Sequence, residues 1–275
     1  DVYFTDEMTG YIAGGTWTGG PVYKTTDGGL SWFGLPNFPV GLFTSTLISI
    51  TFTDSVTGFA SGTNTTVKTT DAGESWYEPS GLPGGIGRFF FLNKNNGWGT
   101  SGKNILKTTD GGENWLTQLT VPNGSFSSIN FVDSLYGWAT ISGRRPYKTT
   151  DGGLNWIEQT DLDIWESRDV YIKDYLNGFL LESNKLYKTT DGGTTFNLVL
   201  NITGFSIAAK FSNYGDSTIF ITGYKTYRSI DGGINWFDFD ELSGIRINGL
   251  SLLGMGFGFA VGELGIVLRY YDETV

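Results

Sequence analysis

Two short segments of the chain each contain a pair of carboxylates that could act together. Asp161 and Asp163 are two residues apart, and so are Asp238 and Asp240. Glycoside hydrolases use such a pair, with one carboxyl group as general acid and the other as base or nucleophile. Alternating acids are also typical of solvated loops that carry out no chemistry. The spacing leaves both interpretations open, and no catalytic constellation is recognised around either pair.

Arginines are the second group of residues with a chemistry of their own. Five of the seven lie outside a repeated motif: Arg88, Arg144, Arg145, Arg168 and Arg246. A guanidinium binds a carboxylate through two parallel hydrogen bonds, so clustered arginines would form a small cationic patch for a carboxylate or a peptide terminus. The alternative is that Glu166, Asp169 and Glu241 pair with them at the surface, where ion pairs contribute little to stability.

Residue types that the chain lacks argue against several kinds of function. It has no Cys, which excludes thiol chemistry, and no His, which removes the commonest general base and transition-metal ligand. The net charge of −10 argues against a nucleic-acid partner, because phosphates are bound by a cationic surface. The longest nearly apolar stretch, 250–262, is too short and too rich in glycine to span a bilayer. We therefore expect no cofactor, no nucleic acid and no membrane span.

A third set of carboxylates recurs at a nearly constant interval. The motif Lys-Thr-Thr-Asp-Gly-Gly-x-x-Trp first occupies residues 24–32 and returns five more times with little change. Its aspartates are Asp27, Asp71, Asp110, Asp151, Asp191 and Asp231, with Asp272 in a decayed seventh copy, at intervals of 44, 39, 41, 40, 40 and 41 residues. Carboxylates some forty residues apart cannot converge on one ion that needs six or more oxygens. We therefore expect each aspartate to be structural, accepting hydrogen bonds from its own tight turn while the two glycines adopt positive φ angles.

A fixed interval near forty residues is typical of a repeat architecture. Each repeat begins with large apolar residues two apart, as in Val2-Tyr3-Phe4, and continues through a polar turn to a Gly–aromatic pair such as Gly10-Tyr11. A third strand leads into the aspartate motif, and a fourth begins at its Trp. Four short strands in each of seven repeats predict an all-β protein, a single seven-bladed β-propeller that occupies residues 1–275. The repeats are expected at 1–46, 47–86, 87–126, 127–167, 168–205, 206–246 and 247–275.

The recurring motif resembles the Asp-box, also called the bacterial neuraminidase repeat. With the preceding Phe-x-Asp-x-x-x-Gly-aromatic stretch, it makes the whole chain most similar to the propeller family typified by the photosystem II assembly and stability factor. Asp-boxes also occur in sialidases, xyloglucanases and sortilin-type receptors, so the resemblance is more specific for fold than for function. Sialidases have six blades and an Arg-Ile-Pro segment, which is missing here. Xyloglucanases place their catalytic aspartates between two propellers.

The resemblance implies that a ligand binds on the face opposite the Asp-boxes, over the centre of the ring. Loops from the fourth strand of one blade to the first strand of the next would build that face. Trp17 and Trp165 lie outside the repeat pattern, and Phe38 and Phe43 lie in the long first inter-blade loop. These aromatic residues are candidates for stacking on a sugar or contacting a protein. The alternative is that they pack over the ends of the blades.

The seventh repeat ends after its third strand, near residues 266–269, so the last blade is expected to be incomplete. An unpaired strand edge is a template for another strand. We expect either that the natural polypeptide extends further or that a neighbouring chain donates the missing strand.

Together these observations predict a non-catalytic binding or assembly module that recognises a protein or glycan partner. The chain begins at Asp1 inside a strand, without Met or a hydrophobic leader, which indicates a trimmed product. With the family resemblance, this predicts a secreted or cell-surface location in a bacterium. The alternative function is that of a glycoside hydrolase of the sialidase-like or xyloglucanase-like type.

Overall fold

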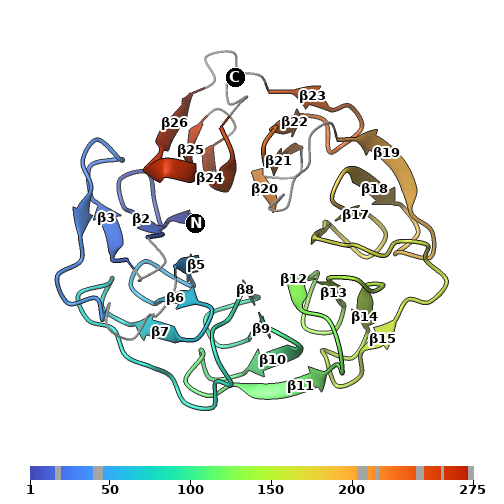
Figure 1. The fold of residues 1–275 in the computed structure, drawn as a ribbon, viewed down its shortest axis with the longest axis horizontal. Helices are drawn as coiled ribbons and strands as arrows, with labels where there is room; N and C mark the ends of the chain where they lie inside the picture. Colours follow the sequence, from blue (N-terminus) through green and yellow to red (C-terminus); the bar gives the residue numbers. More distant parts are fainter. Residues whose placement is uncertain are drawn as a thin grey trace.

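The chain folds into a ring of seven antiparallel sheets around a common axis (Figure 1). The structure is a computed structural model that describes residues 1–15, 20–39, 46–202, 210–214, 217–239, 245–254 and 257–271. Within these ranges there is one 3-10 turn, Glu263–Gly265 (η3), and no α-helix. The predicted seven-bladed propeller is confirmed.

Five of the blades contain four strands, which follow one another in the sheet as they do in the chain. Blade 1 consists of β1 (Val2–Phe4), β2 (Gly10–Ala13), β3 (Val22–Thr25) and β4 (Phe33–Gly34). Blade 3 consists of β8 (Arg88–Phe91), β9 (Gly97–Ser101), β10 (Asn104–Thr108) and β11 (Leu116–Thr120). Blade 4 consists of β12 (Phe126–Phe131), β13 (Gly137–Ile141), β14 (Tyr147–Thr149) and β15 (Ile157–Glu158). Blade 5 consists of β16 (Asp169–Ile172), β17 (Gly178–Leu181), β18 (Lys185–Thr189) and β19 (Asn197–Asn201). Blade 6 consists of β20 (Lys210–Tyr214), β21 (Thr218–Thr222), β22 (Tyr227–Ser229) and β23 (Phe237–Asp238).

Two blades have three strands in the described part of the chain, blade 2 against the expected four and blade 7 in line with the expected incomplete last blade. Blade 2 consists of β5 (Leu47–Phe52), β6 (Gly58–Gly62) and β7 (Thr66–Thr69). Its fourth strand is reduced to one bridge between Lys68 and Tyr77, and Pro79 follows with no N–H to continue the ladder. Blade 7 consists of β24 (Ile247–Gly254), β25 (Phe257–Gly262) and β26 (Val267–Tyr271), and residues 272–275 lie outside the described part of the chain.

The first strand of each blade lies nearest the axis and contacts the first strands of the neighbouring blades (Figure 1). An inner strand pairs within its blade on one side only, so its remaining N–H groups need other partners. At four places a side chain of the preceding blade supplies the acceptor. These bonds run from Ile50 N–H to Asp1 Oδ2 (3.2 Å), from Ile172 N–H to Asn130 Oδ1 (3.1 Å), from Phe211 N–H to Asp169 Oδ2 (2.8 Å) and from Phe4 N–H to Ser251 Oγ (3.2 Å). The last of these joins blade 7 to blade 1.

The aspartate turns, defined as the repeated motif from its Thr to its Trp, are closed by a buried hydroxyl and an exposed carboxylate. In blade 3, Thr108 Oγ1 donates to Asp110 Oδ1 (2.9 Å) and accepts from Gly112 N–H (2.8 Å). Asp110 accepts from the backbone N–H of Asn114 (3.0 Å) and from its side-chain amide (2.8 Å). Gly111 and Gly112 have φ angles of +72° and +81°, which glycine adopts at little cost. The structural role predicted for the aspartate thus matches its contacts in this turn.

The second glycine of each aspartate turn lies against the preceding blade. A Cβ atom on Gly193 would lie 2.2 Å from the Trp138 ring, and one on Gly29 would lie 2.4 Å from the Phe259 ring. Gly29 belongs to blade 1 and Phe259 to blade 7, so this contact helps to close the ring. The basic residue of the motif spans the same seam, since Lys148 Nζ lies 5.3 Å from the centre of the Trp138 ring and donates to a carbonyl of the next turn (2.7 Å). The motif therefore both closes a hairpin and joins neighbouring blades.

Candidate functional site

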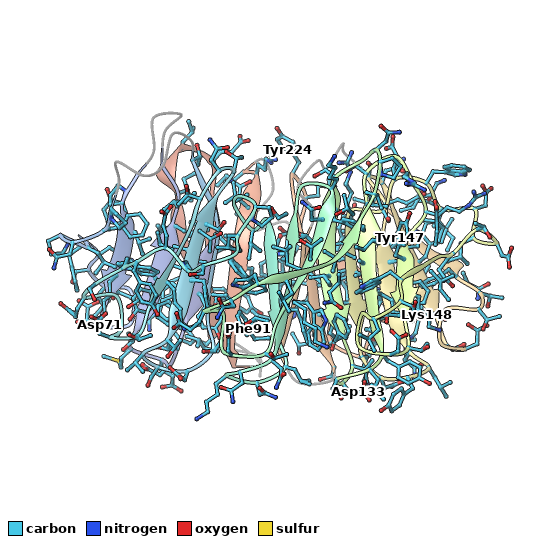
Figure 2. All side chains as sticks on the ribbon, turned by 90° about the horizontal axis from the view of Figure 1, so that it is seen from below. Asp71, Phe91, Asp133, Tyr147, Lys148 and Tyr224 are labelled. Atoms are coloured by element: carbon cyan, nitrogen blue, oxygen red, sulfur yellow. The ribbon has the colours of Figure 1, made fainter. Side chains whose placement is uncertain are left out.

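The two faces of the ring are built from different connections. Gly28 N–H donates to Met8 O (2.9 Å), so the aspartate turn and the first turn of the same blade share one face. Asp71 and Asp133, one from each kind of turn, lie at one end of the molecule, and Tyr224 of a second-to-third strand loop lies at the other (Figure 2). The opposite face is the one on which the sequence predicts ligand binding.

On that opposite face, a loop from β15 to β16 projects a tryptophan between blades 4 and 5. Leu162 and Ile164 are buried in this loop, whereas Asp161, Asp163 and Trp165 between and beside them are exposed. The alternation fixes the loop by its apolar side chains and directs the polar and aromatic ones outward. The indole of Trp165 is thereby held at the surface, with 49% of the residue exposed.

Three contacts hold Trp165 in place. The guanidinium of Arg145 lies 4.0 Å from the centre of the Trp165 ring, and Arg145 Nε donates to Leu162 O (2.6 Å). Trp165 Nε1 donates to Asp163 Oδ1 (3.1 Å), and its backbone N–H donates to Glu182 Oε1 (3.2 Å). The Arg145 guanidinium thus lies over one face of the indole, and such a cation–π contact contributes about 0.5–1 kcal/mol at exposed sites.

Arg168 completes this group at the start of blade 5. Its Nε atom donates to Ser183 Oγ (3.3 Å), and Ser183 Oγ donates in turn to Glu166 Oε2 (3.3 Å). Within the described residues neither Arg145 nor Arg168 has a carboxylate within 4.0 Å. Arg145, Trp165 and Arg168 therefore form the candidate binding surface, called here the Trp165 surface.

The other three predicted arginines are ion-paired. Arg88 Nη2 lies 3.0 Å from Asp169 Oδ2, Arg144 Nη2 lies 2.6 Å from Glu158 Oε2, and Arg246 Nη1 lies 3.0 Å from Glu263 Oε1. Arg88 starts the inner strand of blade 3, and Arg246 directly precedes the inner strand of blade 7. The ion pair of Arg88 brings it to Asp169, the residue that follows Arg168 of the Trp165 surface. Glu241, named as a partner from the sequence, lies outside the described residues. A role of Arg88, Arg144 and Arg246 in binding a partner stays a prediction.

The remaining sequence candidates fall into two groups. Trp17, Phe43 and Asp240 lie outside the described residues. Phe38 is not an exposed stacking residue, because it is buried with its ring 5.4 Å from that of Trp76. Of the two alternatives that the sequence left open for Phe38, packing over the blade end is the one observed.

Contacts are described for one member of each predicted carboxylate pair, and the two members bind different groups. Asp163 is bound to the indole of Trp165, whereas Asp238 in blade 6 lies 2.5 Å from Lys225 Nζ. Among the described residues no group of three Asp or Glu side chains could hold a metal ion. The described residues also include no helix of the length and apolarity needed to cross a membrane.

The sequence did not single out the buried hydroxyl of each aspartate turn. The residue two positions before each aspartate exposes 2% or less of its surface: Thr25, Thr69, Thr108, Thr149, Thr189 and Ser229. The aspartate itself is exposed or half-buried. Its pKa is lowered to about 2 in Asp110, first by the backbone and side-chain hydrogen bonds from Asn114, and to about 2 in Asp71, first by the hydroxyl of Ser75. A Thr or Ser stands two positions before the aspartate in all six copies of the motif, and this pattern could have revealed the role of the hydroxyl.

The fold and the Trp165 surface together define a seven-bladed propeller with a candidate binding face. Solved structures of this shape include YCF48 from Cyanidioschyzon merolae, which is 21% identical with a TM-score of 0.76 over 100% of this chain and 95% of that one. YCF48 bound to D1 peptide is 19% identical, with a TM-score of 0.72 over 99% of this chain and 93% of that one. A GH74 xyloglucanase from Xanthomonas campestris is 12% identical, with a TM-score of 0.75 over 98% of this chain and 51% of the enzyme chain. No family model and no curated protein sequence matches the chain. At these identities the likeness establishes the fold.

Proposed function

We propose that the chain is a non-catalytic binding module that assembles with a protein partner through the Trp165 surface. The observation that carries the proposal is the half-exposed indole of Trp165, held by the Arg145 guanidinium at 4.0 Å. A rigid aromatic ring beside arginine is the composition of interface positions that dominate binding energy. The peptide complex of the similar YCF48 propeller supports a protein partner.

The charges of the Trp165 surface specify the kind of segment that would bind. Arg145 and Arg168 retain donor groups beyond the single Nε bonds that they make. A carboxylate of the partner would receive charge-assisted hydrogen bonds from them, while an apolar side chain covers the open part of the indole. The partner segment is therefore a peptide with a free carboxyl terminus or an acidic residue next to an apolar one. A secreted or cell-surface location in a bacterium belongs to the same proposal and rests on the sequence resemblance.

The test uses two pools of fluorescently labelled octapeptides that differ only in the carboxyl terminus, which is a free acid in one and an amide in the other. We expect the free-acid pool to bind more tightly in fluorescence anisotropy, and Arg145→Ala and Trp165→Ala each to weaken binding at least tenfold. Arg246→Ala is the control, because Arg246 likewise makes a cation–π contact, on Tyr224, but lies outside this surface. Equal binding by all variants, or none by the wild type, would contradict the proposal.

The hydrolase remains the second candidate because a GH74 propeller shares the fold. Fluorogenic sialosides and β-glucans test it directly. Turnover by the wild type that is lost in Asp163→Ala would show that the protein is an enzyme and would refute the proposed binding module. If the protein binds a glycan array without turnover, and if this binding requires Trp165, the partner is a sugar and not a protein.

A further inference from the structure

Two tyrosines lie next to each other on the face that carries the aspartate turns. Tyr136 belongs to the first turn of blade 4, between β12 and β13, and Tyr175 belongs to the first turn of blade 5, between β16 and β17. Their rings make an edge-to-face contact, with centres 5.0 Å apart and an angle of 83° between the planes. Both residues are exposed, Tyr136 by 38% and Tyr175 by 55%. The completely described first turns of blades 1, 2 and 3 contain no aromatic residue, so the repeat does not require this pair.

A hydrogen bond between the two turns holds the tyrosines in place. In blade 5, the side-chain amide of Asn177 closes its own turn by donating to Asp174 Oδ2 (2.9 Å). Tyr136 occupies the position of this asparagine in blade 4. The carboxylate of its turn, Asp133, instead accepts from the hydroxyl of Tyr175 in the next blade (2.5 Å). The ring of Tyr175 is thereby fixed before a partner arrives, which lowers the entropic cost of binding.

A leucine stands beside the tyrosine in each turn. Leu135 and Leu176 occupy equivalent positions, where the backbone carbonyl accepts the N–H of the first glycine of the aspartate turn at 2.9 Å. The side chains are left at the surface, with 48% of Leu135 and 57% of Leu176 exposed. Leu135, Tyr136, Tyr175 and Leu176 are called here the tyrosine patch. Exposed apolar residues that gather in one place within a polar rim mark interaction sites, whereas single ones are ordinary.

The turns around the tyrosine patch are acidic. The first turns of blades 4 and 5, at 132–136 and 173–177, and their aspartate turns, at 149–156 and 189–196, contain four carboxylates and one cation: Asp133, Asp151, Asp174, Asp191 and Lys173. The pKa of Asp133 is lowered, first by the hydroxyl of Tyr175, so this carboxylate is ionised at neutral pH. The net charge of the whole chain, −10, has the same sign. A partner that complements this surface is therefore cationic.

We propose that the tyrosine patch binds a basic segment of a partner protein, in which an arginine or lysine stands next to an apolar residue. The cation lies over a tyrosine ring, where the ring quadrupole and the neighbouring carboxylates both attract it. The apolar residue covers the exposed leucines. A second copy of the chain would bring two acidic surfaces together, so charge complementarity favours the basic segment. The Trp165 surface lies on the opposite face of the same two blades and favours an acidic segment, so blades 4 and 5 bridge two partners of opposite charge.

A labelled octapeptide of alternating leucine and arginine provides the probe. It is acetylated and amidated at its ends, so it has no carboxylate for the Trp165 surface. We expect it to bind the intact protein in fluorescence anisotropy. Replacement of its arginines by citrulline, which keeps the shape of the side chain without the charge, should weaken binding at least tenfold. The proposal is overturned if the arginine peptide does not bind, or if the citrulline peptide binds equally well.

Two lysine substitutions at equivalent positions separate the tyrosine patch from the overall charge of the protein. Leu135→Lys places a like charge in the patch and should weaken binding of the arginine peptide at least tenfold. Val56→Lys is the matched control, because Val56 has the same position in the first turn of blade 2 and is 44% exposed. Its carbonyl likewise accepts from the aspartate turn, from Ala72 N–H at 2.8 Å. This control should bind within threefold of the wild type, and equal weakening by both substitutions would refute the site.

Tyrosine variants test the aromatic contact. Tyr175→Ala should weaken binding of the arginine peptide at least tenfold, whereas Tyr175→Phe keeps the ring and should bind within threefold of the wild type. Tyr77→Ala is the control, because Tyr77 is 39% exposed and also donates its hydroxyl to a carboxylate of the next blade, Glu113, at 2.7 Å. It should bind like the wild type.

Two further measurements separate this site from the alternatives. Trp165→Ala should bind the arginine peptide within threefold of the wild type, so this proposal and the proposed function can fail separately. A tenfold loss in Trp165→Ala would assign the peptide to the Trp165 surface and overturn the proposal. It is also overturned if ultracentrifugation detects a dimer that Leu135→Lys abolishes, because a second copy would then be the occupant.

Discussion

The guanidinium of Arg88 lies 3.0 Å from the carboxylate of Asp169, although the two residues begin the inner strands of blades that are not neighbours. Asp169 is buried, and it also accepts the backbone N–H of Phe211 from blade 6 at 2.8 Å. One carboxylate therefore links blades 3, 5 and 6 around the axis. Such a pair differs from a surface ion pair because the loss of one partner leaves the other charge poorly solvated.

Asp169→Asn should consequently destabilise the protein by about 3 kcal/mol, the cost of breaking a buried pair from one side. Asparagine keeps the size and one acceptor for Phe211, so the loss reports mainly on Arg88. The double variant Arg88→Met/Asp169→Asn should recover part of the stability, as measured by chemical denaturation. A single variant within 0.5 kcal/mol of the wild type would show that the pair is as weak as an exposed one.

The buried hydroxyl of the aspartate turn gives a second prediction. Thr108→Val preserves the shape of the side chain but leaves Gly112 N–H without its acceptor, which should cost about 1–3 kcal/mol. Thr109→Val in the same turn is the control, because Thr109 is exposed and should change stability by less than about 0.5 kcal/mol. Urea denaturation of both variants separates the cases, and equal losses would contradict the role assigned to Thr108.

The lowered pKa values of the turn aspartates predict an acid-sensitive fold. A pKa near 2 in the folded state lies below the value of about 3.9 in an unfolded chain, so the ionised form stabilises the fold above pH 4. This contribution is lost as the pH falls from about 4 to about 2. The melting temperature should therefore drop steeply across that range at constant ionic strength.

A variant of one turn checks the origin of this acid sensitivity. Asp71→Asn should lower the melting temperature at pH 7, and its curve should approach that of the wild type toward pH 2. The hydroxyl of Ser75 is the first cause of the lowered pKa of Asp71, so Ser75→Ala should move the acid transition of this turn to higher pH. A constant difference between wild type and Asp71→Asn at every pH would assign the acid sensitivity to other carboxylates.

The fold could be predicted from the sequence because the repeats share recognisable strand and turn residues. The interval of the aspartates gave the number of blades, and the Gly–aromatic pairs gave the second strands. Contacts between blades could not be derived in the same way, because they depend on how the ring closes. Asp169 was expected to pair with an arginine, but its partner Arg88 is 81 residues away and comes from two blades earlier.

The candidate site was predicted in part. Trp165 stood out because it interrupts the repeat, and the structure does expose it on a loop. The contact between Trp165 and Arg145 could not be predicted, because the two residues belong to different loops that meet only in the folded blade. The partners Glu182 and Ser183 were missed as well, because a polar turn between strands has no distinctive spacing.

The seam between the first and last blades yields the final prediction. Gly29 and Gly143 both have positive φ angles, +79° and +71°, so alanine is strained at either position by roughly 1–2 kcal/mol. A Cβ on Gly29 would also lie 2.4 Å from the Phe259 ring, whereas one on Gly143 meets nothing within 4 Å. Gly29→Ala should therefore cost about 1–3 kcal/mol more than Gly143→Ala, the range expected for overpacking. Because the excess arises where blade 7 meets blade 1, it should be accompanied by faster hydrogen exchange in β1 and β25, with β13 and β14 unchanged. Equal destabilisation by the two substitutions, or exchange that rises uniformly around the ring, would show that this glycine contact does not hold the ring closed.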